Sequence, residues 1–580
     1  MRHRRACKEV LVHSAGGAVE PYEFQEEAWG EIATRLADGG GALLVEAPTA
    51  SGKTEAATAP YFAQWLSEEW FLAPGLVYVL PTRALVEAQS ERFRQLTRSM
   101  NKNLVIRAEQ GSLIPSRHYL FGDVVVSTID AFIYGLVAKR VPGGHTNPRL
   151  DFPAGNIATA FVVFDEVHMY QDEELYMPRV VNRVFRCLEG AQVPFVVMTA
   201  TLPTEIEEVL FEGVEVRRVK QPAVDRGSVE VEVREKSIFD YLKTEGFEAL
   251  LSAKRALIVC NTVERAHRVF RIVVAELRRL GGLDFDIIHL LHSRLKREDR
   301  RGREREVAAL RYEKKRALVV TTQVLEAGLD ASFDLVITEA CPLDALLQRL
   351  GRCARRSHEE GKAVVVRPEG NAPYHEKILS ESWDVVCGEH ERISLALRHL
   401  ERAKSLLDEV YTRALVEDLI SSARSSRYLF ESELYLARLR LFDMPPEHEF
   451  RLRPEMYATL VVADRAVPVI DELLRSRMLN LGERAPEERE EVFKQLEELT
   501  FNVPVGAVER LFEQGALLRE GDSALALTVR RGQIVVEPTR IERGRLRTYL
   551  LDPDRYEEFD QEPLMQYPVG LVELGGTRSG

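Results

Sequence analysis

The stretch ALLVEAPTASGKT occupies residues 42–54 and decides the fold class of this chain. A short apolar run enters a loop that ends in Gly-Lys-Thr, and a helical pattern, EAATAPYFAQWLSEEW, follows at once. Strand, loop and helix in this order form the pattern of a phosphate-binding loop, although its usual first glycine is Ala47 here. The backbone N–H groups of such a loop and the start of its helix both attract phosphate oxygens. The sequence therefore predicts a nucleotide-binding α/β domain.

The residues of this loop have separate expected roles. Ala47, Ser51 and Gly52 would bring the backbone close to the phosphates. Lys53 would supply a positive charge to the β- and γ-phosphates, and Thr54 would offer its hydroxyl to Mg²⁺. ATP and Mg²⁺ are thus the expected ligands. The alternative, an ordinary strand–helix turn that happens to contain these residues, is disfavoured by the position of the loop between a strand and a helix.

A second motif, FVVFDEVH at residues 161–168, places two acids at the end of another apolar strand. Asp165 would hold Mg²⁺, directly or through water. Glu166 would orient and deprotonate the attacking water. Taken alone, the motif is also compatible with a strand that ends in solvated charges. Together with the phosphate-binding loop, it predicts a site for phosphoryl transfer.

The third motif, QRLGRCARR at residues 348–356, is rich in arginine. Gln348, Arg349, Arg352 and Arg355 recur at i, i+1, i+4 and i+7, so we expect one helical face to present several of them. Phosphoryl transfer needs cations near the transferred group, and arginine fingers of this kind raise the rate by roughly 10³–10⁵. The alternative is a basic, solvated helix face.

Buried strands alternate with helical patterns along much of the chain, which predicts α/β domains with parallel sheets. The strands come in two series, GALLVEAP, GLVYVLPT, DVVVST, TAFVVFDE and PFVVMTAT, then RALIVCNT, FDIIHLLHS, RALVVTTQ, DLVITEACP and KAVVVRP. We expect one domain over 1–215, a linker over 216–245 and a second domain over 246–370. Residues 371–580 should form a mainly helical C-terminal region with one β-rich piece, ALALTVRRGQIVVEP.

Composition limits the class of protein. A net charge of -13 and a pI near 5.7 argue against a generally basic protein that coats nucleic acid, although a local groove remains compatible. The six cysteines form no C-x-x-C pair, so no zinc ribbon is indicated. No apolar run could cross a bilayer and no signal peptide is evident, which predicts a cytoplasmic protein without membrane partners. The stretch LHSRLKREDRRGRERE, residues 291–306, favours a solvated helix over a phosphate track.

Residues 20–360 resemble superfamily 2 helicases of the DExH type, because these motifs occur together with PTRALVEAQ, STID, TAT, NT and TTQVLEAGLD. The resemblance implies two tandem RecA-like domains. It implies that Gln25 reads adenine, that Gly328 and Asp330 contact the nucleotide, and that His168, Thr199 and Thr201 couple hydrolysis to movement. It implies nucleic-acid contacts for Thr82, Arg83, Thr128, Asp130, Asn261, Thr262, Thr321 and Thr322. The alternative is that a Thr or Asn at a strand end merely caps a helix or forms a turn.

DEVHMYQDEE, MTATLP, CNTVERA and ACPLDALLQRLGRCARR resemble the helicase of type I CRISPR systems. The resemblance implies movement on single-stranded DNA after an RNA-guided surveillance complex has displaced one strand. The chain contains no His-Asp dipeptide, so we expect the histidine–aspartate nuclease of such systems to be a separate subunit. Two alternatives stay open: a general DExH helicase in RNA metabolism or DNA repair, and a nucleotide-regulated scaffold for a nuclease. ATPase stimulation by DNA or RNA separates the enzymes, and absent turnover would indicate the scaffold.

Overall fold

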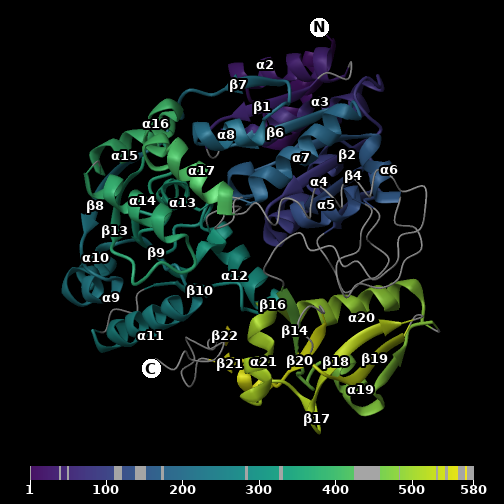
Figure 1. Ribbon diagram of the computed structural model, residues 1–580, viewed down its shortest axis with the longest axis vertical. Coiled ribbons are helices and arrows are strands. Elements are labelled where there is room, and N and C mark those ends of the chain that lie inside the picture. Colours follow the sequence, from purple (N-terminus) through teal and green to yellow (C-terminus); the bar gives the residue numbers. More distant parts are fainter. Residues whose placement is uncertain are drawn as a thin grey trace.

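The computed structural model describes most of the chain. The described residues are 2–37, 41–48, 51–109, 120–137, 152–170, 176–280, 285–325, 331–388, 390–422, 457–482, 484–530, 533–541, 547–558 and 568–570. Three sheets organise them, one above, one at the left and one below in Figure 1.

The first sheet has seven parallel strands in the order β3-β4-β2-β5-β6-β1-β7. The strands are β1 Ala42–Glu46, β2 Gly75–Leu80, β3 Ile106–Glu109, β4 Val124–Thr128, β5 Ala160–Phe164, β6 Phe195–Thr199 and β7 Val216–Lys220. The helices are α1 Arg2–Ala15, α2 Glu23–Glu31, α3 Lys53–Ser67, α4 Arg83–Ser99, α5 Ile129–Leu136, α6 Phe152–Ala158, α7 Tyr176–Gly190 and α8 Thr204–Leu210. Leu44 and Val45 enter different hydrophobic clusters, because neighbouring strand residues point to opposite faces. Both faces are therefore buried.

The second sheet has six parallel strands in the order β10-β11-β9-β12-β13-β8. The strands are β8 Ser228–Arg234, β9 Arg255–Val259, β10 Ile287–Leu291, β11 Ala317–Thr321, β12 Leu335–Glu339 and β13 Glu360–Val366. The helices are α9 Ile238–Tyr241, α10 Phe247–Ser252, α11 Val263–Arg279, α12 Arg297–Ala309 and α13 Leu343–Leu350. Two tandem parallel sheets confirm the predicted α/β fold class.

The segment expected as a linker, 216–245, belongs largely to the two sheets. β7 pairs with β1 in the first sheet and β8 pairs with β13 in the second, so residues 221–227 alone join them. Both strands lie at sheet edges and carry exposed charged residues, as in VRRVK and SVEVEVR. Edge strands commonly carry such charges, so a search for apolar runs does not detect these strands. This part of the domain prediction was wrong for that reason.

The C-terminal region begins with the predicted helices and then adds a third sheet. The helices are α14 Glu376–Gly388, α15 His390–Ala396, α16 Leu400–Val410 and α17 Arg413–Ser422. The third sheet contains β14 Tyr457–Val462, β15 Met478–Asn480, β16 Thr500–Pro504, β17 Arg519–Glu520, β18 Ser523–Arg530, β19 Gln533–Thr539 and β20 Thr548–Leu551. Beside it lie α19 Pro468–Ser476, α20 Pro486–Glu498 and α21 Val505–Glu513, followed by the pair β21 Glu557–Glu558 and β22 Pro568–Gly570. Only β18 and β19 were expected.

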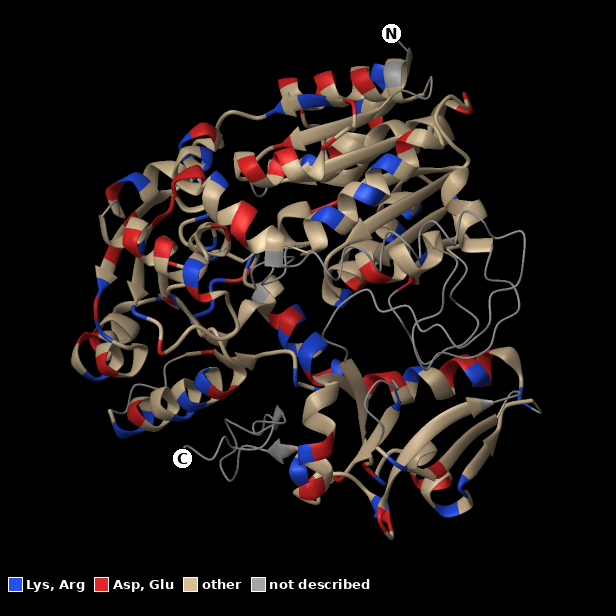
Figure 2. Cartoon of the chain, viewed as in Figure 1, with Lys and Arg blue, Asp and Glu red and all other residues tan. Residues whose placement is uncertain are grey.

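Helix α12 lies where the three parts meet, and its charged residues are seen beside α20 in Figure 2. The expectation of a solvated helix was wrong, because Arg297 and Arg303 are buried. Arg297 pairs with Glu87 of α4 and with Glu497 of α20, each at 2.9 Å. Charged side chains become buried only when they are paired, and carboxylates from two other domains supply the partners here.

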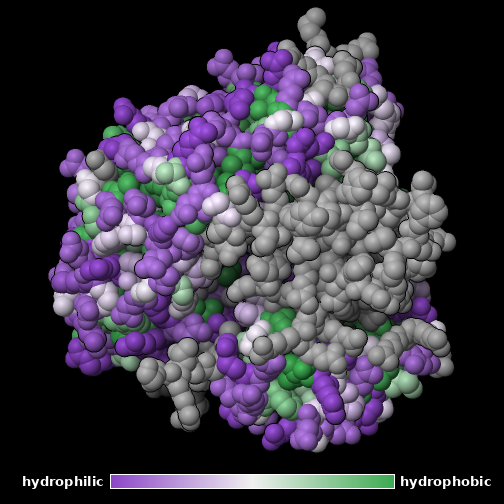
Figure 3. Space-filling model, viewed as in Figure 1, coloured by the Kyte–Doolittle hydropathy of each residue, from purple (hydrophilic) through white to green (hydrophobic). Residues whose placement is uncertain are grey.

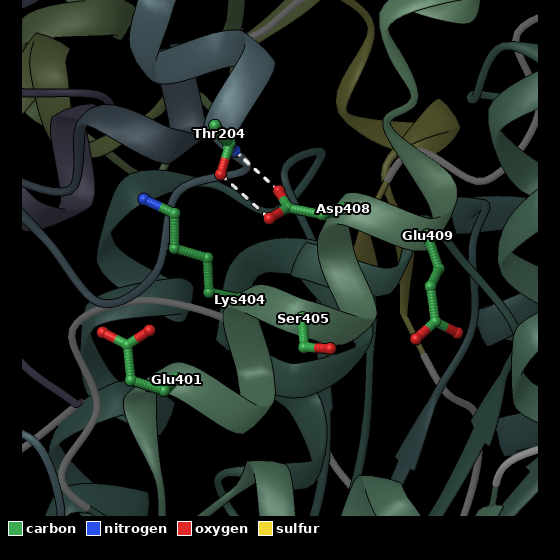
Figure 4. A pocket seen from close by; sticks show the side chains of 6 residues that line it. All are labelled: Thr204, Glu401, Lys404, Ser405, Asp408 and Glu409. Carbon is green, nitrogen blue, oxygen red and sulfur yellow. Dashed lines mark hydrogen bonds between the residues drawn. The ribbon is translucent and has the colours of Figure 1, made fainter.

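Helix α16 forms a second junction, with the start of α8. The Asp408 carboxylate accepts from the backbone N–H of Thr204 at 2.7 Å and from its hydroxyl at 2.9 Å, as Figure 4 shows. Lys404 pairs with Glu207 at 2.6 Å. A polar pocket lies there, lined by Thr204, Glu401, Lys404, Ser405, Asp408 and Glu409. The first domain thus contacts the region beyond the second sheet.

Outside the atoms drawn in grey, the face in Figure 3 is mainly hydrophilic, with small separate hydrophobic areas. Among the described helices, none is long and apolar enough to span a membrane.

Candidate nucleotide and nucleic-acid site

The phosphate-binding loop connects β1 to α3, and its described residues face the second acidic motif. Lys53 Nζ donates to the carbonyl of Ala47 at 2.9 Å and lies 3.8 Å from the Glu166 carboxylate. Gly52 has a φ of 88°, and a Cβ at this position would approach the Gln25 amide nitrogen to 2.5 Å. Glycine is therefore required for both conformation and space. The buried hydroxyl of Ser51 has no hydrogen-bond partner among the described residues, which leaves a polar atom available to a ligand.

Gln25 lies directly beside this loop. Its Oε1 accepts from the backbone N–H of Tyr22 at 2.9 Å, at the start of α2, and its Nε2 donates to the carbonyl of Gly52 at 3.0 Å. The side chain is buried. This places Gln25 next to the phosphate-binding loop, and its expected contact with adenine stays a prediction.

Asp165 and Glu166 follow β5 and differ in their surroundings. Asp165 Oδ1 accepts from the N–H of Glu166 at 2.9 Å, and its Oδ2 accepts from the Tyr78 hydroxyl at 2.5 Å. Burial, with a smaller effect of the Glu166 charge, raises the pKa of Asp165 to about 7. Glu166 has a φ of 52°, a left-handed conformation that costs a non-glycine residue on the order of 1–3 kcal/mol and often occurs at functional sites.

The electrostatic surroundings of Glu166 include both predicted arginines of the second domain. Burial alone would raise the pKa of Glu166, but Lys53, His168, Arg352 and Arg355 together lower it. The charges of both arginines therefore act on the same carboxylate as that of Lys53, from the opposite domain. A carboxylate kept ionised between such cations can act on a water proton.

The prediction that these arginines lie on one face of a helix was wrong. Helix α13 ends at Leu350, and Arg352 and Arg355 lie in the turns that follow. The chain leaves the helix at Gly351, and Ala354 has a φ of 44°. Backbone hydrogen bonds between this turn and Phe333 hold the segment in place.

A chain of polar contacts crosses between the two sheets. His168 Nδ1 lies 3.0 Å from the Thr199 hydroxyl, which is 3.4 Å from the carbonyl of Thr201. His168 Nε2 lies 3.2 Å from the amide nitrogen of Gln348 in the second domain. Burial lowers the pKa of His168, so the imidazole is neutral near pH 7. The structure thus brings together His168, Thr199, Thr201 and Gln348.

The residues expected to contact nucleic acid fall into two groups. Thr82, Thr128 and Thr262 each cap a helix, accepting from the N–H groups of Leu85, Ala131 and Arg265 at 3.3–3.4 Å. These caps agree with the structural alternative for strand-end threonines. Next to Thr82, burial and the nearby Arg297 lower the pKa of Arg83 to about 10, so basic groups of two domains converge here.

The second group lies inside the second domain. The Asn261 amide donates to the carbonyl of Ala340 at 2.8 Å and accepts from Arg349 at 2.9 Å, while Thr321 donates to the carbonyl of Leu291 at 3.0 Å. The geometry therefore gives Asn261 and Thr321 internal partners. Thr322 is buried and Asp130 is half-buried. Gly328 and Asp330 lie outside the described residues.

The donor set fits Mg²⁺ held partly by nucleotide phosphates. Among the described residues, no group of three or more His, Cys, Asp or Glu could hold a metal ion alone. Magnesium in nucleotide sites commonly uses one or two protein oxygens together with substrate phosphates. Thr54 and Asp165 carry side-chain oxygens of this kind, and their role as Mg²⁺ ligands stays a prediction. Tyr78 and Arg92, which contact these residues, were missed from sequence, although a tyrosine within the apolar strand GLVYVL was an available signal.

Known proteins resemble this chain over most of its length. The family model for DEAD/DEAH box helicases matches residues 22–209, and the model for the C-terminal part of the CRISPR-associated nuclease/helicase Cas3 matches residues 252–358. The CRISPR-associated helicase Cas3 of Thermoproteus tenax is 34% identical over 435 residues, which covers 73% of this chain and 72% of that protein. The CRISPR-associated endonuclease/helicase Cas3 of Thermus thermophilus is 26% identical, and the match covers 68% of this chain and 53% of that protein.

Solved structures show the same fold at lower identity. A crystal structure of T. fusca Cas3 with AMPPNP has a TM-score of 0.63 and 19% identity, and the match covers 93% of this chain and 69% of the other. The Mycobacterium smegmatis helicase Lhr bound to single-stranded DNA and AMP-PNP has a TM-score of 0.50 and 19% identity, over 74% of this chain and 57% of the other.

Proposed function

We propose, because the chain belongs to the family of CRISPR-associated Cas3 helicases, that it moves along single-stranded DNA and unwinds target DNA in type I CRISPR interference. It is an ATP-dependent helicase with a DEAD/DEAH-box domain. The observation that carries the proposal is that Lys53, at 3.8 Å, and the charges of Arg352 and Arg355 all act on Glu166, because this couples both domains to one reactive group.

The mechanism follows from the two sides of this site. Lys53 would hold the phosphates of ATP, while Glu166 would take the proton of the attacking water. Arg352 and Arg355 would stabilise the charge that develops on the transferred group, so the closed arrangement is favoured only while the γ-phosphate is present. Mg²⁺, held by Thr54 and Asp165, would neutralise phosphate charge. Loss of the γ-phosphate would then release the second domain.

The His168–Gln348 contact would transmit this opening. His168 is two residues from Glu166, and Gln348 begins the segment that leads to the arginines. Thr82, Arg83, Thr128 and Asp130 would grip a strand on the first domain. Contacts of this kind to the sugar–phosphate backbone carry no sequence information, so sequence-independent binding is expected.

Two partners belong to the proposal. One is an RNA-guided surveillance complex, which is supported by the similarity of this chain to a solved structure of a CRISPR RNA-guided surveillance complex, pre-nicking. The other is a separate histidine–aspartate nuclease, which is supported by the absence of a His-Asp dipeptide from this sequence. We expect the purified chain not to cleave DNA in the presence of divalent metal.

Strand displacement tests the function directly. The full chain and the Lys53→Ala variant are compared on forked DNA and forked RNA duplexes with ATP and Mg²⁺. The proposal expects DNA unwinding by the wild type and its loss in the variant. Preference for RNA would instead support a general DExH helicase, and retained ATP binding without turnover in the wild type would support a scaffold.

A further inference from the structure

The unit formed by β2 and α4, residues 75–99, touches two parts of the proposed machinery. Thr82 caps α4 and Arg83 is the first residue of that helix, and both are expected to grip nucleic acid. Within the strand and the helix lie Tyr78 and Arg92, which contact the residues expected to hold Mg²⁺. The unit therefore joins the strand-binding residues to the metal-binding residues through one short piece of chain.

Tyr78 fixes Asp165. Its hydroxyl donates to Asp165 Oδ2 at 2.5 Å, and the ring packs edge-on against Phe93 of α4 with centroids 5.3 Å apart. The side chain is fully buried in the centre of the sheet. Phenylalanine would fill the same space, and a buried hydroxyl is costly unless it is hydrogen-bonded. The bond to Asp165 gives the hydroxyl its partner, while the other carboxylate oxygen is held by the N–H of Glu166.

Arg92 fixes the second ligand. Its Nη1 lies 3.3 Å from the Thr54 hydroxyl, and its Nη2 pairs with the neighbouring Glu55 carboxylate. Glu55 in turn accepts from the Ser14 hydroxyl at 2.7 Å. Thr54 and Asp165 each contact a different side chain of the same unit, so a shift of that unit would move both ligands together.

We infer that Tyr78 and Arg92 are positioning residues that set the affinity of the nucleotide site for Mg²⁺ and make it respond to a strand bound at Thr82 and Arg83. The inference rests on the proposed function. Partners of metal ligands orient those ligands, and their loss commonly weakens metal binding roughly 10–100-fold. The hydroxyl of Tyr78 and the guanidinium of Arg92 meet this description, because each touches an expected ligand and neither is a ligand itself.

The test measures binding of a fluorescent ADP analogue to the full-length chain during titration with Mg²⁺. The variant is Tyr78→Phe. Its matched control is Tyr61→Phe, because Tyr61 is also fully buried in the first domain and donates to the carbonyl of Asp123 at 2.5 Å, away from the ligands. We expect Tyr78→Phe to need roughly tenfold more Mg²⁺ for the half-maximal effect. Binding in EDTA should match the wild type, and Tyr61→Phe should match it throughout.

A second arm adds a short single-stranded oligodeoxythymidine. In the wild type the strand should shift the Mg²⁺ midpoint, and in both Tyr78→Phe and Arg92→Gln this shift should be lost. Arg92→Gln also keeps the inference testable if Tyr78→Phe does not fold. If binding of the ADP analogue to the wild type does not depend on Mg²⁺, both the proposed nucleotide site and the inference are overturned. Tyr78→Phe could instead keep the wild-type Mg²⁺ midpoint and show only a lower melting temperature, as Tyr61→Phe would also do. That result would overturn the inference but not the proposed nucleotide site.

Discussion

The imidazole Nε2 of His168 lies 3.2 Å from the side-chain amide nitrogen of Gln348, and the two residues belong to different domains. The amide nitrogen donates, so Nε2 accepts and Nδ1 carries the proton toward the Thr199 hydroxyl. This arrangement needs a neutral imidazole, in agreement with the lowered pKa of His168. The contact therefore links the end of β6 to the arginine-bearing segment through one defined tautomer.

Replacing Gln348 by alanine should weaken the coupling between hydrolysis and strand movement. Loss of one hydrogen bond across the domain boundary should lower nucleic-acid-stimulated ATPase roughly tenfold, and unwinding by at least as much. Steady-state ATPase with and without single-stranded DNA measures this. The control is Gln95→Ala on the exposed face of α4. Equal stimulation in wild type and Gln348→Ala would contradict the coupling role.

Replacing Glu166 by glutamine should remove the base but keep the shape of the site. We expect kcat to fall by roughly 10²–10⁴, with ATP affinity nearly unchanged because Lys53 remains in place. Single-turnover hydrolysis and equilibrium nucleotide binding separate the two effects. A variant that hydrolyses ATP at the wild-type rate would show that another group accepts the proton.

Replacing Glu87 by glutamine should loosen the three-domain junction. Glu87 pairs with Arg297 at 2.9 Å and with Arg301 at 2.6 Å, and these arginines also pair with Glu497 and Glu498. The pairs are partly exposed, so we expect a loss of on the order of 1–3 kcal/mol, larger at low salt.

Thermal unfolding at low and high salt measures this loss. Glu91→Gln is the control, because Glu91 lies on the same helix but pairs only with exposed arginines of α4 in the described structure. Similar melting temperatures for the two variants would show that the junction adds no stability.

His267 should make stability depend on pH. Burial on α11, with the nearby charge of Arg271, lowers its pKa from 6.5 to about 4. The unfolded chain therefore binds a proton at a pH where the folded chain does not. The contribution of His267 to the free energy of unfolding is therefore fully present above about pH 6.5. It decreases as the pH falls toward 4, and the decrease is about 2 kcal/mol at pH 5. Thermal unfolding of wild type and His267→Gln across this range should show a larger loss of stability in the wild type as the pH falls, and equal losses in the two would exclude the effect.

The sequence was most informative where function depends on strand ends. Lys53 ends the loop that follows β1, Asp165 and Glu166 follow β5 directly, and parallel strands bring such ends to one edge of the sheet. Gln348 was expected on a helix that follows an apolar strand, and it lies in α13 after β12. These residues are placed by the order of strands, loops and helices along the chain, and this order can be predicted from a single sequence.

Other features depend on contacts between distant segments. Arg297 was assigned to a solvated helix because its acidic partners lie about two hundred residues away in either direction along the chain. The helix was predicted to continue through the turn after α13, because the backbone hydrogen bonds to Phe333 have no signal in the sequence. Most strands of the third sheet are short and carry polar residues, so periodicity revealed only β18 and β19.

The central claim is that Arg352 and Arg355 complete the ATP site on Glu166. The most direct test is single-turnover ATP hydrolysis by Arg352→Ala and Arg355→Ala, with ATP affinity measured in parallel. The account predicts a rate lower by roughly 10³ or more in each variant, while affinity stays within a few-fold of the wild type. Wild-type hydrolysis by both variants would contradict it.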